Sequence, residues 1–208
     1  MACMGSEVRH ALRADLDELA ASLVDAFATD PVMAFMYPDP STRPEGSGAF
    51  LRVMLEIGLN HGHVYAAGPK NEAAAIWVPP DVHLFDDEGV KQLWPVLERT
   101  LGDRAELVTN ALTQVAAAQP QDRGPYFYLG EIGTRSAAQS QGLGSLLLRE
   151  VLDRCDRQGL GAHLESSNIR NVPFYERHGF EVIAELDIAP GCIVRPMWRD
   201  PQGELLGA

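Results

Sequence analysis

Apolar residues recur at helical spacing in the first third of the chain. Leu16, Leu19 and Leu23 lie three or four positions apart, and residues 49–62 repeat this pattern. The run between them, residues 38–48, is rich in Pro, Gly and Ser, which is typical of a loop. We therefore expect two amphipathic helices joined by an irregular connection.

Strand patterns flank these two helices. A short strand is expected at residues 8–12, before the first helix. Two apolar runs, 63–69 and 73–80, are separated by a short polar turn, as in a hairpin. Residues 86–118 return to helical spacing and are broken around Gly102, which predicts two further helices.

The second half of the chain reads as strand, helix and strand. The aromatic run 124–134 predicts a strand, residues 143–158 a helix and residues 161–167 another strand. Such a unit implies two parallel central strands joined by a right-handed crossover. Residues 171–179 predict a short helix, and residues 180–198 predict two closing strands.

Composition is that of an ordinary globular protein. The chain has 208 residues, of which 46% are hydrophobic and 22% are charged, so we expect one mixed α/β domain over residues 1–208. No apolar run reaches bilayer length and the N-terminus lacks the apolar core of a signal peptide, so we expect a cytoplasmic protein without a membrane partner. A net charge of −12 argues against a nucleic-acid partner and is compatible with a cationic small substrate, such as an amine.

Cysteine and histidine show no metal pattern. The three cysteines are scattered, and Cys155 falls on the apolar face of a predicted helix, where we expect core packing. His61 and His63 flank Gly62 without a third ligand nearby in the sequence. We read this segment as a turn into a strand and predict no metal site.

A glycine-containing loop precedes the long predicted helix of the second half. Leu147 stands where a G-x-G-x-x-G dinucleotide motif needs its third glycine, and Gly144 is followed by Ser145 and leucine rather than by the Lys of a P-loop. What remains is Q-x-x-G-x-G, running from Gln139 to Gly144. Free N–H groups of a first helical turn can hold an anion at such a loop, although the segment can also be only a turn.

This loop, taken with the segment that follows it, resembles the GNAT superfamily of N-acetyltransferases. Asn171, the pair Phe174 and Tyr175, and the pair Gly179 and Phe180 follow in the family's order. The layout of the whole chain resembles, more distantly, the puromycin N-acetyltransferases of that superfamily. The resemblance implies an acetyl-CoA-dependent enzyme. It also implies a mixed α/β (α+β) fold with flanking helices around a central mixed sheet of about seven strands, in which the two central parallel strands splay apart.

The resemblance also implies roles for residues of the central strand, the loop and the short helix. The backbone of the strand would contact the pantetheine arm, the loop would cradle the pyrophosphate, and Ser145 would add a hydroxyl group. Asn171 would hold amide groups of the coenzyme, and Tyr175 would protonate the departing thiolate. The loop departs from the family at Gln141, where a cation is frequent, which puts coenzyme affinity in question. The expected coenzyme-binding residues are Ile132, Gly133, Thr134, Gln139, Ser140, Gln141, Gly142, Leu143, Gly144, Ser145, Asn171 and Phe174.

The general base stays open between three alternatives. Glu131 is the carboxylate of the central strand, and a carboxylate among apolar neighbours can have a raised pKa. Strict alternation places Tyr126, Tyr128, Gly130, Ile132 and Thr134 on one face and Glu131 on the other, unless a bulge intervenes. Bases of the family match Tyr128 or Gly130. The candidates are therefore Glu131, Tyr128 or a water relay, and a structural role for Glu131 is equally compatible with the sequence.

We predict that the enzyme moves an acetyl group from acetyl-CoA to a primary amine by direct attack in a ternary complex. The acceptor would be a small molecule, antibiotic- or aminonucleoside-like for example. The alternatives are a peptide or protein amine, or a non-catalytic CoA-binding sensor. Residues 30–38, residues 77–85 and the inserted helices are the expected walls of the acceptor pocket, with Phe35, Tyr37 and Trp77 as candidate apolar contacts or ordinary packing. The oligomeric state would be monomer or homodimer.

Overall fold

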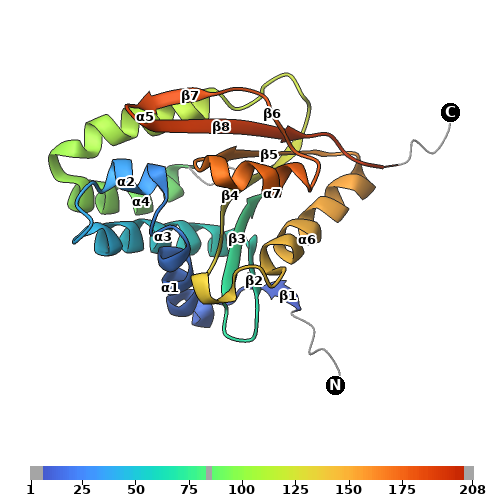
Figure 1. Ribbon diagram of the computed structural model, residues 1–208, viewed down its shortest axis with the longest axis horizontal. Coiled ribbons are helices and arrows are strands. Elements are labelled where there is room, and N and C mark those ends of the chain that lie inside the picture. The colour runs from blue at the N-terminus through green and yellow to red at the C-terminus, as the bar shows by residue number, and fades with distance from the viewer. Residues whose placement is uncertain (1–6, 83–85, 204–208) are drawn as a thin grey trace.

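The chain is built around one twisted sheet (Figure 1). A computed structural model describes residues 7–82 and 86–203. The strands in these ranges are β1 (Val8–His10), β2 (Val64–Ala67), β3 (Ala73–Val78), β4 (Tyr126–Thr134), β5 (Gly161–Ser166), β6 (Glu181–Val182), β7 (Leu186–Ala189) and β8 (Cys192–Arg199). Eight strands of the described ranges pair in the order β1-β2-β3-β4-β5-β8-β6, and β7 pairs with β8. The β4–β5 pair is parallel and the other pairs are antiparallel.

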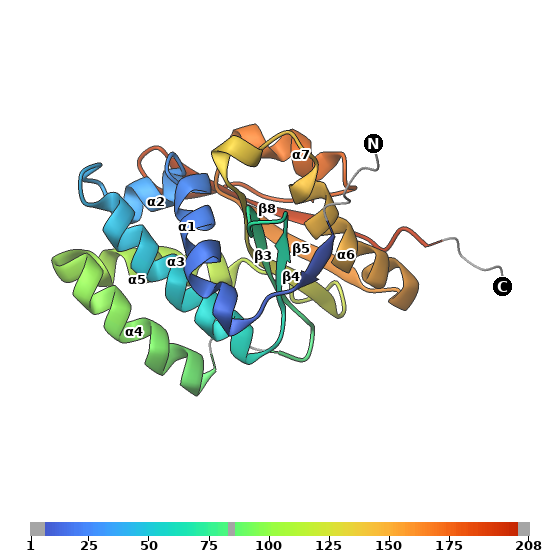
Figure 2. The same cartoon turned by 90° about the horizontal axis from the view of Figure 1, so that it is seen from below.

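Helices cover both faces of this sheet and create two cores. The helices are α1 (Leu16–Ala26), α2 (Pro31–Met36), α3 (Arg43–Asn60), α4 (Asp87–Leu101), α5 (Ala105–Ala117), α6 (Leu143–Gln158) and α7 (Val172–Glu176). Figure 2 shows α1 to α5 gathered on one side and α6 on the other. Leu19 and Leu51 are fully buried in the first core, whereas Trp77 and Leu147 are fully buried in the second. The sheet therefore separates two apolar cores. None of the helices in the described ranges has the length and apolar character needed to cross a bilayer.

The central parallel strands separate after only four paired residues. Their ladder runs from the pair Tyr126–Gly161 to the pair Leu129–Leu164, although β4 continues to Thr134. Beyond this point β4 keeps only β3 as its neighbour, so every second residue presents an unpaired N–H and C=O to the gap. The splay expected from the family resemblance is thus present, and the mixed α/β fold is confirmed.

A β-bulge in β4 changes which residues face which core. Ile76 of β3 is opposite Glu131, but the next residue of β3 is opposite Leu129, so Gly130 is an extra residue. Glu131 consequently lies on the same face as Tyr128, on the side of α1 and α3, and not on the opposite face as strict alternation predicts. Ile132 is moved to the α6 side by the same insertion.

Two sequence-based boundaries were wrong in the first third of the chain. Residues 43–48 form the start of α3 rather than a loop, and Gly46 packs directly beneath the ring of Tyr37. The short helix α2 was not predicted, because a proline such as Pro31 is also typical of the end of a preceding helix. Pro31 is instead a first-turn proline, and Asp30 caps the helix by accepting hydrogen bonds from two backbone N–H groups.

The first of the two closing strands is divided into β6 and β7. Ile183, which follows β6, donates a backbone hydrogen bond to the carbonyl oxygen of Pro196. Pro196 has no N–H to return this bond, so the ladder with β8 ends there and resumes only at Leu186. This interruption is why the described sheet has eight strands and not the expected seven.

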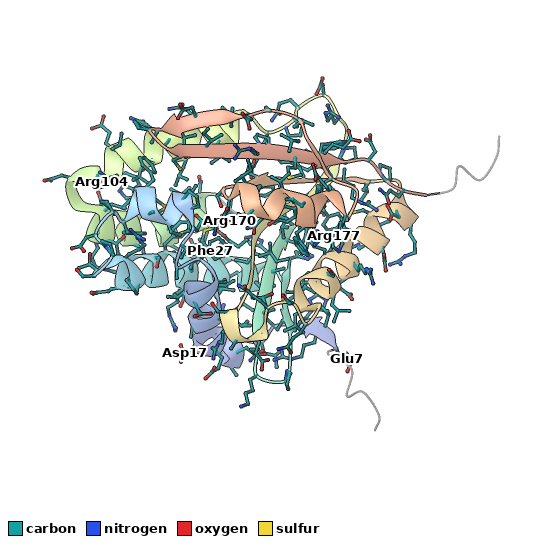
Figure 3. The ribbon with its side chains drawn as sticks, in the orientation of Figure 1. Glu7, Asp17, Phe27, Arg104, Arg170 and Arg177 are labelled. Atoms are coloured by element: carbon teal, nitrogen blue, oxygen red, sulfur yellow. The ribbon has the colours of Figure 1, made fainter. Side chains whose placement is uncertain are left out.

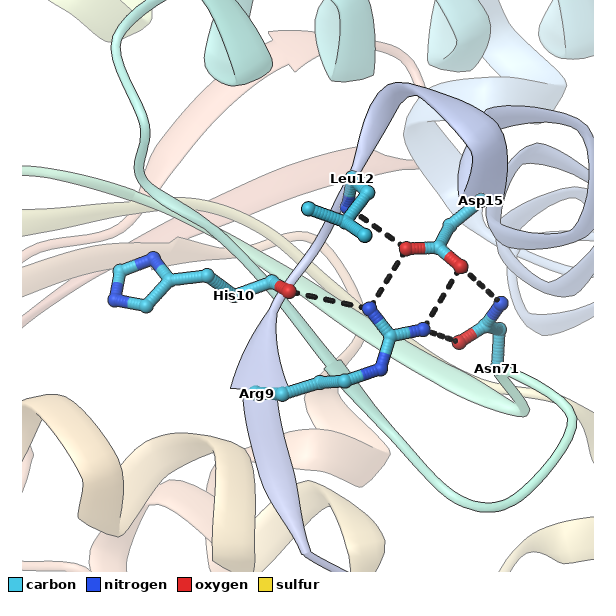
Figure 4. Close-up of polar contacts among 5 residues, drawn as sticks. All are labelled: Arg9, His10, Leu12, Asp15 and Asn71. Carbon is cyan, nitrogen blue, oxygen red and sulfur yellow. Dashed lines mark hydrogen bonds and ion pairs between the residues drawn. The ribbon is translucent and has the colours of Figure 1, made fainter.

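A polar cluster fixes the N-terminal strand to the first helix and to the β2–β3 turn (Figure 4). Both terminal nitrogens of the Arg9 guanidinium donate to Asp15, at 2.7 and 2.8 Å, and Asn71 contacts both partners. Asp15 also accepts a hydrogen bond from the Leu12 N–H, and these bonds hold the pKa of its carboxyl far below its usual range. The cluster joins β1 and the start of α1 to the β2–β3 turn, which is distant in sequence, and so fixes the β1 edge of the sheet.

Candidate active site

A cavity of about 780 Å³ passes through the sheet where β4 and β5 separate. On one face it is lined by residues of α1, α2, α3 and α5, and on the other by the start of α6 and by α7. Residues of the predicted coenzyme site and the two predicted catalytic residues therefore border one continuous space. The residues that line it and bear on the chemistry are Asp30, Tyr128, Glu131, Glu165, Asn171, Phe174, Tyr175 and Arg177.

The loop before α6 has the backbone geometry of an anion site. Gly142 is the N-cap of α6 with φ 85°, a conformation that favours glycine, and open space surrounds the position of its missing Cβ. The N–H groups of Leu143, Gly144 and Ser145 belong to the first turn, so they have no intrahelical acceptor. The side chain of Gln139 is not free, because its amide donates to the Thr134 carbonyl oxygen at 3.1 Å.

The second glycine of the loop has a packing role. A Cβ on Gly144 would come 3.2 Å from Cζ of Phe174, so the absence of a side chain at this residue lets α7 pack closely against the first turn of α6. Arg177 lies 5.9 Å over the ring of Phe174 and donates to the Pro173 carbonyl oxygen at 2.9 Å. Figure 3 shows Arg177 at the end of α7 nearer to α6. A cation thus borders the cavity beside the loop, although Gln141 supplies none.

Glu131 projects into the cavity from the bulged part of β4. It is partly buried, and no hydrogen bond from the described residues reaches its carboxylate. Burial, followed by the negative charges of Asp30 and Glu165, raises the pKa of the carboxyl from its ordinary value of 4.5 to about 8. A carboxyl with this pKa is suited to accept a proton near neutral pH.

Tyr175 reaches the same cavity from the opposite face of the sheet. The residue is 7% exposed and packs against Phe174 and Phe180, and its phenol has no hydrogen-bond partner among the described residues. Burial raises the pKa of this phenol well above 10, and the charges of Glu131 and Asp30 add to the effect. The phenol is therefore neutral over the physiological range and can act only as a proton donor.

Two further acids border the cavity. Asp30 is 7% exposed, and its second oxygen accepts a hydrogen bond from the Ser167 hydroxyl, which ties α2 to the end of β5. Burial raises the pKa of Asp30, although its hydrogen bonds oppose this. Glu165 lies 2.9 Å from Nε2 of His163, and the pKa of the neighbouring Tyr128 phenol is raised by burial and by the charge of Glu165.

Comparison with known proteins agrees with this geometry. A sequence profile of the Acetyltransferase (GNAT) family matches residues 104–180, the stretch that holds the splayed strand, the loop and α7. An uncharacterised N-acetyltransferase of Schizosaccharomyces pombe is 27% identical over 180 residues, which cover 80% of this chain and 70% of the relative. Over this stretch the chain matches the GNAT family of acetyltransferases. Together with the curated relative, this match supports an acetyl-transferring enzyme, and acetyl-CoA is the acyl donor of that family.

Solved structures of this family share the fold. Histone acetyltransferase HPA2 and related acetyltransferase from Corynebacterium glutamicum has a TM-score of 0.67 and 24% identity, over 98% of this chain and 100% of that one. Drosophila melanogaster polyamine N-acetyltransferase, which forms N-acetylagmatine, has a TM-score of 0.65 and 15% identity, over 94% and 100%. Arylalkylamine N-acetyltransferase 2 of Aedes aegypti has a TM-score of 0.62 and 11% identity, over 94% and 99%. At these identities the likeness concerns the fold alone.

The walls of the acceptor pocket were predicted in part. The α2 segment and the inserted helix α5, through Leu112 and Val115, line the cavity as expected. Trp77 does not, because it is fully buried against α6 on the other face of the sheet. Phe35 and Tyr37 also lie outside the lining, and the phenol of Tyr37 is 3.1 Å from the Thr100 hydroxyl. Residues 83–85 of the expected wall lie outside the described residues.

The acids of the cavity other than Glu131 were missed by sequence reasoning. Asp30 fell within the expected wall of residues 30–38 but was not singled out, and Glu165 alternates with buried residues in a predicted strand. The signal for Glu165 was its position two residues after His163 on the same face of β5. Asn171 and Phe174, which were predicted to bind the coenzyme, border the cavity. Their contacts with the coenzyme stay predictions.

The remaining cysteines and histidines have ordinary surroundings. Cys155 and Cys192 are buried free thiols, and Cys155 lies in the α6 core as expected, whereas Cys3 lies outside the described residues. His61 and His63 occupy the turn between α3 and β2. No group of three metal-ligating side chains gathers within residues 7–82 and 86–203.

Proposed function

We propose that this acetyltransferase transfers an acetyl group from acetyl-CoA to a primary amine of a small cationic molecule, with both substrates bound together in one domain formed by the whole chain. The observation that carries the proposal is the division of the cavity. Backbone N–H groups and Arg177 border it beside α6, whereas Asp30, Glu131 and Glu165 border it on the side of α2. An anionic donor and a cationic acceptor would each meet groups of opposite charge.

The residues present fit acetyl-CoA. The unpaired edge of Ile132, Gly133 and Thr134 offers backbone groups at the gap, and the first turn of α6 offers free N–H groups to a pyrophosphate. Ser145 and the exposed Asn171 border the same space. When bound, the coenzyme supplies the activated acetyl group. We propose that it is held by Ile132, Gly133, Thr134, Gln139, Ser140, Gln141, Gly142, Leu143, Gly144, Ser145, Asn171 and Phe174.

Gln141 would contribute little to coenzyme binding. Its side chain is exposed, and its amide donates to the Ala137 carbonyl oxygen at 3.3 Å within the loop itself. Arg177, which approaches the loop through Phe174, is the cation that we propose takes part in holding the phosphate groups.

Glu131 and Tyr175 suit the two proton transfers of the reaction. In its ionised form Glu131 would take a proton from the bound ammonium group, and Tyr175 would donate a proton to the departing sulfur. The two steps are coupled by charge, because the ionised Glu131 carboxylate raises the pKa of the phenol. Once Glu131 has accepted a proton this contribution disappears, so the phenol becomes a stronger acid when its proton is needed.

The acceptor alternatives differ in how much space they need. A peptide amine would have to enter with its backbone, whereas an amine such as agmatine or a polyamine brings a second positive charge to the acidic side. Structural relatives carry names of both kinds, histone acetyltransferase and polyamine N-acetyltransferase. The three acids around one cavity favour the small cation, and puromycin-like amines belong to the same test.

The experiment is a screen for acetyl-CoA-dependent thiol release. The panel contains a diamine, agmatine, an arylalkylamine, puromycin and a short peptide with a free N-terminus, and CoA binding is measured separately by calorimetry. Turnover that is highest with a small cation supports the proposal. Turnover only with the peptide would replace it by peptide acetylation, and CoA binding without any turnover would favour the sensor alternative.

A further inference from the structure

Glu131 and Glu165 stand on opposite sides of the gap between β4 and β5. The parallel ladder ends one residue before Glu165, and the bulge places Glu131 on the same face of the sheet as Tyr128. His163 is the ladder partner of Tyr128, and Glu165 follows it by two residues on the same strand. Two carboxylates and one imidazole therefore meet on one face where the strands separate.

His163 is held between two oxygen atoms. The residue is fully buried, its Nδ1 lies 2.9 Å from the carbonyl oxygen of Met197, and its Nε2 lies 2.9 Å from Oε1 of Glu165. A carbonyl oxygen and an ionised carboxylate are both acceptors, so each contact needs a proton between its two atoms. The imidazole satisfies both acceptors by donating from both ring nitrogens, and in that form it opposes the charge of Glu165.

Aromatic rings shield this pair from solvent. Tyr128 stacks on His163 with ring centroids 5.9 Å apart, and Tyr126 meets the imidazole edge at 5.7 Å. The side chain of Glu165 is 7% exposed. Breaking a buried pair by removing one partner leaves an uncompensated charge that water cannot screen, and a neighbouring carboxyl then ionises less readily.

We propose that His163 is a positioning residue for the acetyl transfer: it holds Glu165 in place and compensates its charge, so that Glu131 can ionise across the gap. This inference rests on the proposed role of Glu131 as general base. The acids that border the cavity with Glu131 are Asp30 at the start of α2, Tyr128 on β4 and Tyr175 on α7. The cations that border it are Arg170 and Arg177 at the two ends of α7, whereas the imidazole of His163 lies directly against Glu165.

The test compares two single variants with the double variant. His163→Gln keeps a neutral donor beside Glu165 but leaves the carboxylate uncompensated, so the acidic limb of the kcat/KM profile should move upward by about one pH unit, as for one charge within ~10 Å at a typical protein dielectric. In Glu165→Gln the carboxylate is replaced by a neutral amide. The acidic limb of the kcat/KM profile of this variant should therefore stay at or below the pH at which it lies in wild type. Combining both changes should return the limb to that position, which a merely structural role of His163 does not predict.

A readout without turnover separates this inference from the proposed function. Carbon-13 NMR titration of the Glu131 carboxyl, assigned with Glu131→Gln, should show the same upward shift in folded His163→Gln and its reversal in the double variant. A shift in the NMR titration without acetylation of any amine would support the charge compensation while refuting the proposed function. An unshifted Glu131 in folded His163→Gln would overturn the inference. If His163→Gln does not fold, an upward shift of the Glu131 titration in Glu165→Gln would overturn the inference equally.

Discussion

Replacing Glu131 by Gln should stabilise the protein at alkaline pH while it removes activity. Burial and the charges of Asp30 and Glu165 raise the pKa of this carboxyl from 4.5 to about 8 in the folded state. Between pH 4.5 and about pH 8, Glu131 of the folded protein keeps a proton that it has lost in the unfolded chain. The contribution of Glu131 to stability therefore falls as pH rises through this window.

The size of the effect follows from the same shift. Full ionisation of a carboxyl with this pKa costs up to about 5 kcal/mol relative to the unfolded chain, because each pKa unit corresponds to about 1.4 kcal/mol. Water in the cavity relaxes around the charge, so we expect about 2–4 kcal/mol of added stability for Glu131→Gln at pH 9. At pH 5 both side chains are neutral and of similar shape, and the difference should be near zero.

Urea unfolding at pH 5, 7 and 9 measures this difference, and an unchanged m-value shows that the same structure unfolds. Glu176→Gln is the matched control, because Glu176 lies on α7 beside Tyr175 with its side chain exposed to solvent. The control should show no comparable gain at high pH. A stability difference between wild type and Glu131→Gln that is the same at all three pH values would refute a desolvated carboxyl at this site.

Three further substitutions test other parts of the site. Tyr175→Phe should lower kcat about tenfold or more while CoA affinity stays nearly unchanged, and unaltered steady-state turnover would exclude the phenol as the acid. Gly133→Ala should lower the free energy of unfolding in urea by about 1–3 kcal/mol, because its Cβ would come 2.8 Å from side-chain atoms of α1. Arg177→Gln should weaken CoA binding about 3- to 10-fold in calorimetry, whereas Arg157→Gln at the far end of α6 should not.

The strand–helix–strand unit of the second half could be predicted because local signals agree there with the tertiary structure. Gly159 ends α6 in a left-handed conformation, and the apolar positions of α6 follow the helical period. In the first third these signals conflict. Gly46 and Ser47 are poor helix formers, yet both are buried in α3, because close packing against Tyr37 outweighs their low propensity.

Only part of the candidate site could be predicted from the sequence, for a related reason. The loop and Tyr175 occupy fixed positions relative to glycines, so their spacing identifies them. Asp30 and Glu165 reach the cavity through tertiary contacts, the one as a helix cap and the other beside a buried imidazole, and no local spacing encodes such contacts. The face of Glu131 depends on the bulge, which a single inserted residue creates without a distinctive pattern beyond Gly130 itself.

The bulge at Gly130 has a consequence for how this strand can be compared or redesigned. Residues before and after it obey opposite parities, so a strand that kept Gly130 but lost the bulge would turn the carboxyl of Glu131 out of the cavity and toward the apolar core beneath α6. An alignment that counts residues would pair Glu131 with the wrong position of a relative that lacks the bulge. Equivalence along β4 is therefore set by its ladder with β3, where Ile76 lies opposite Glu131, the proposed base.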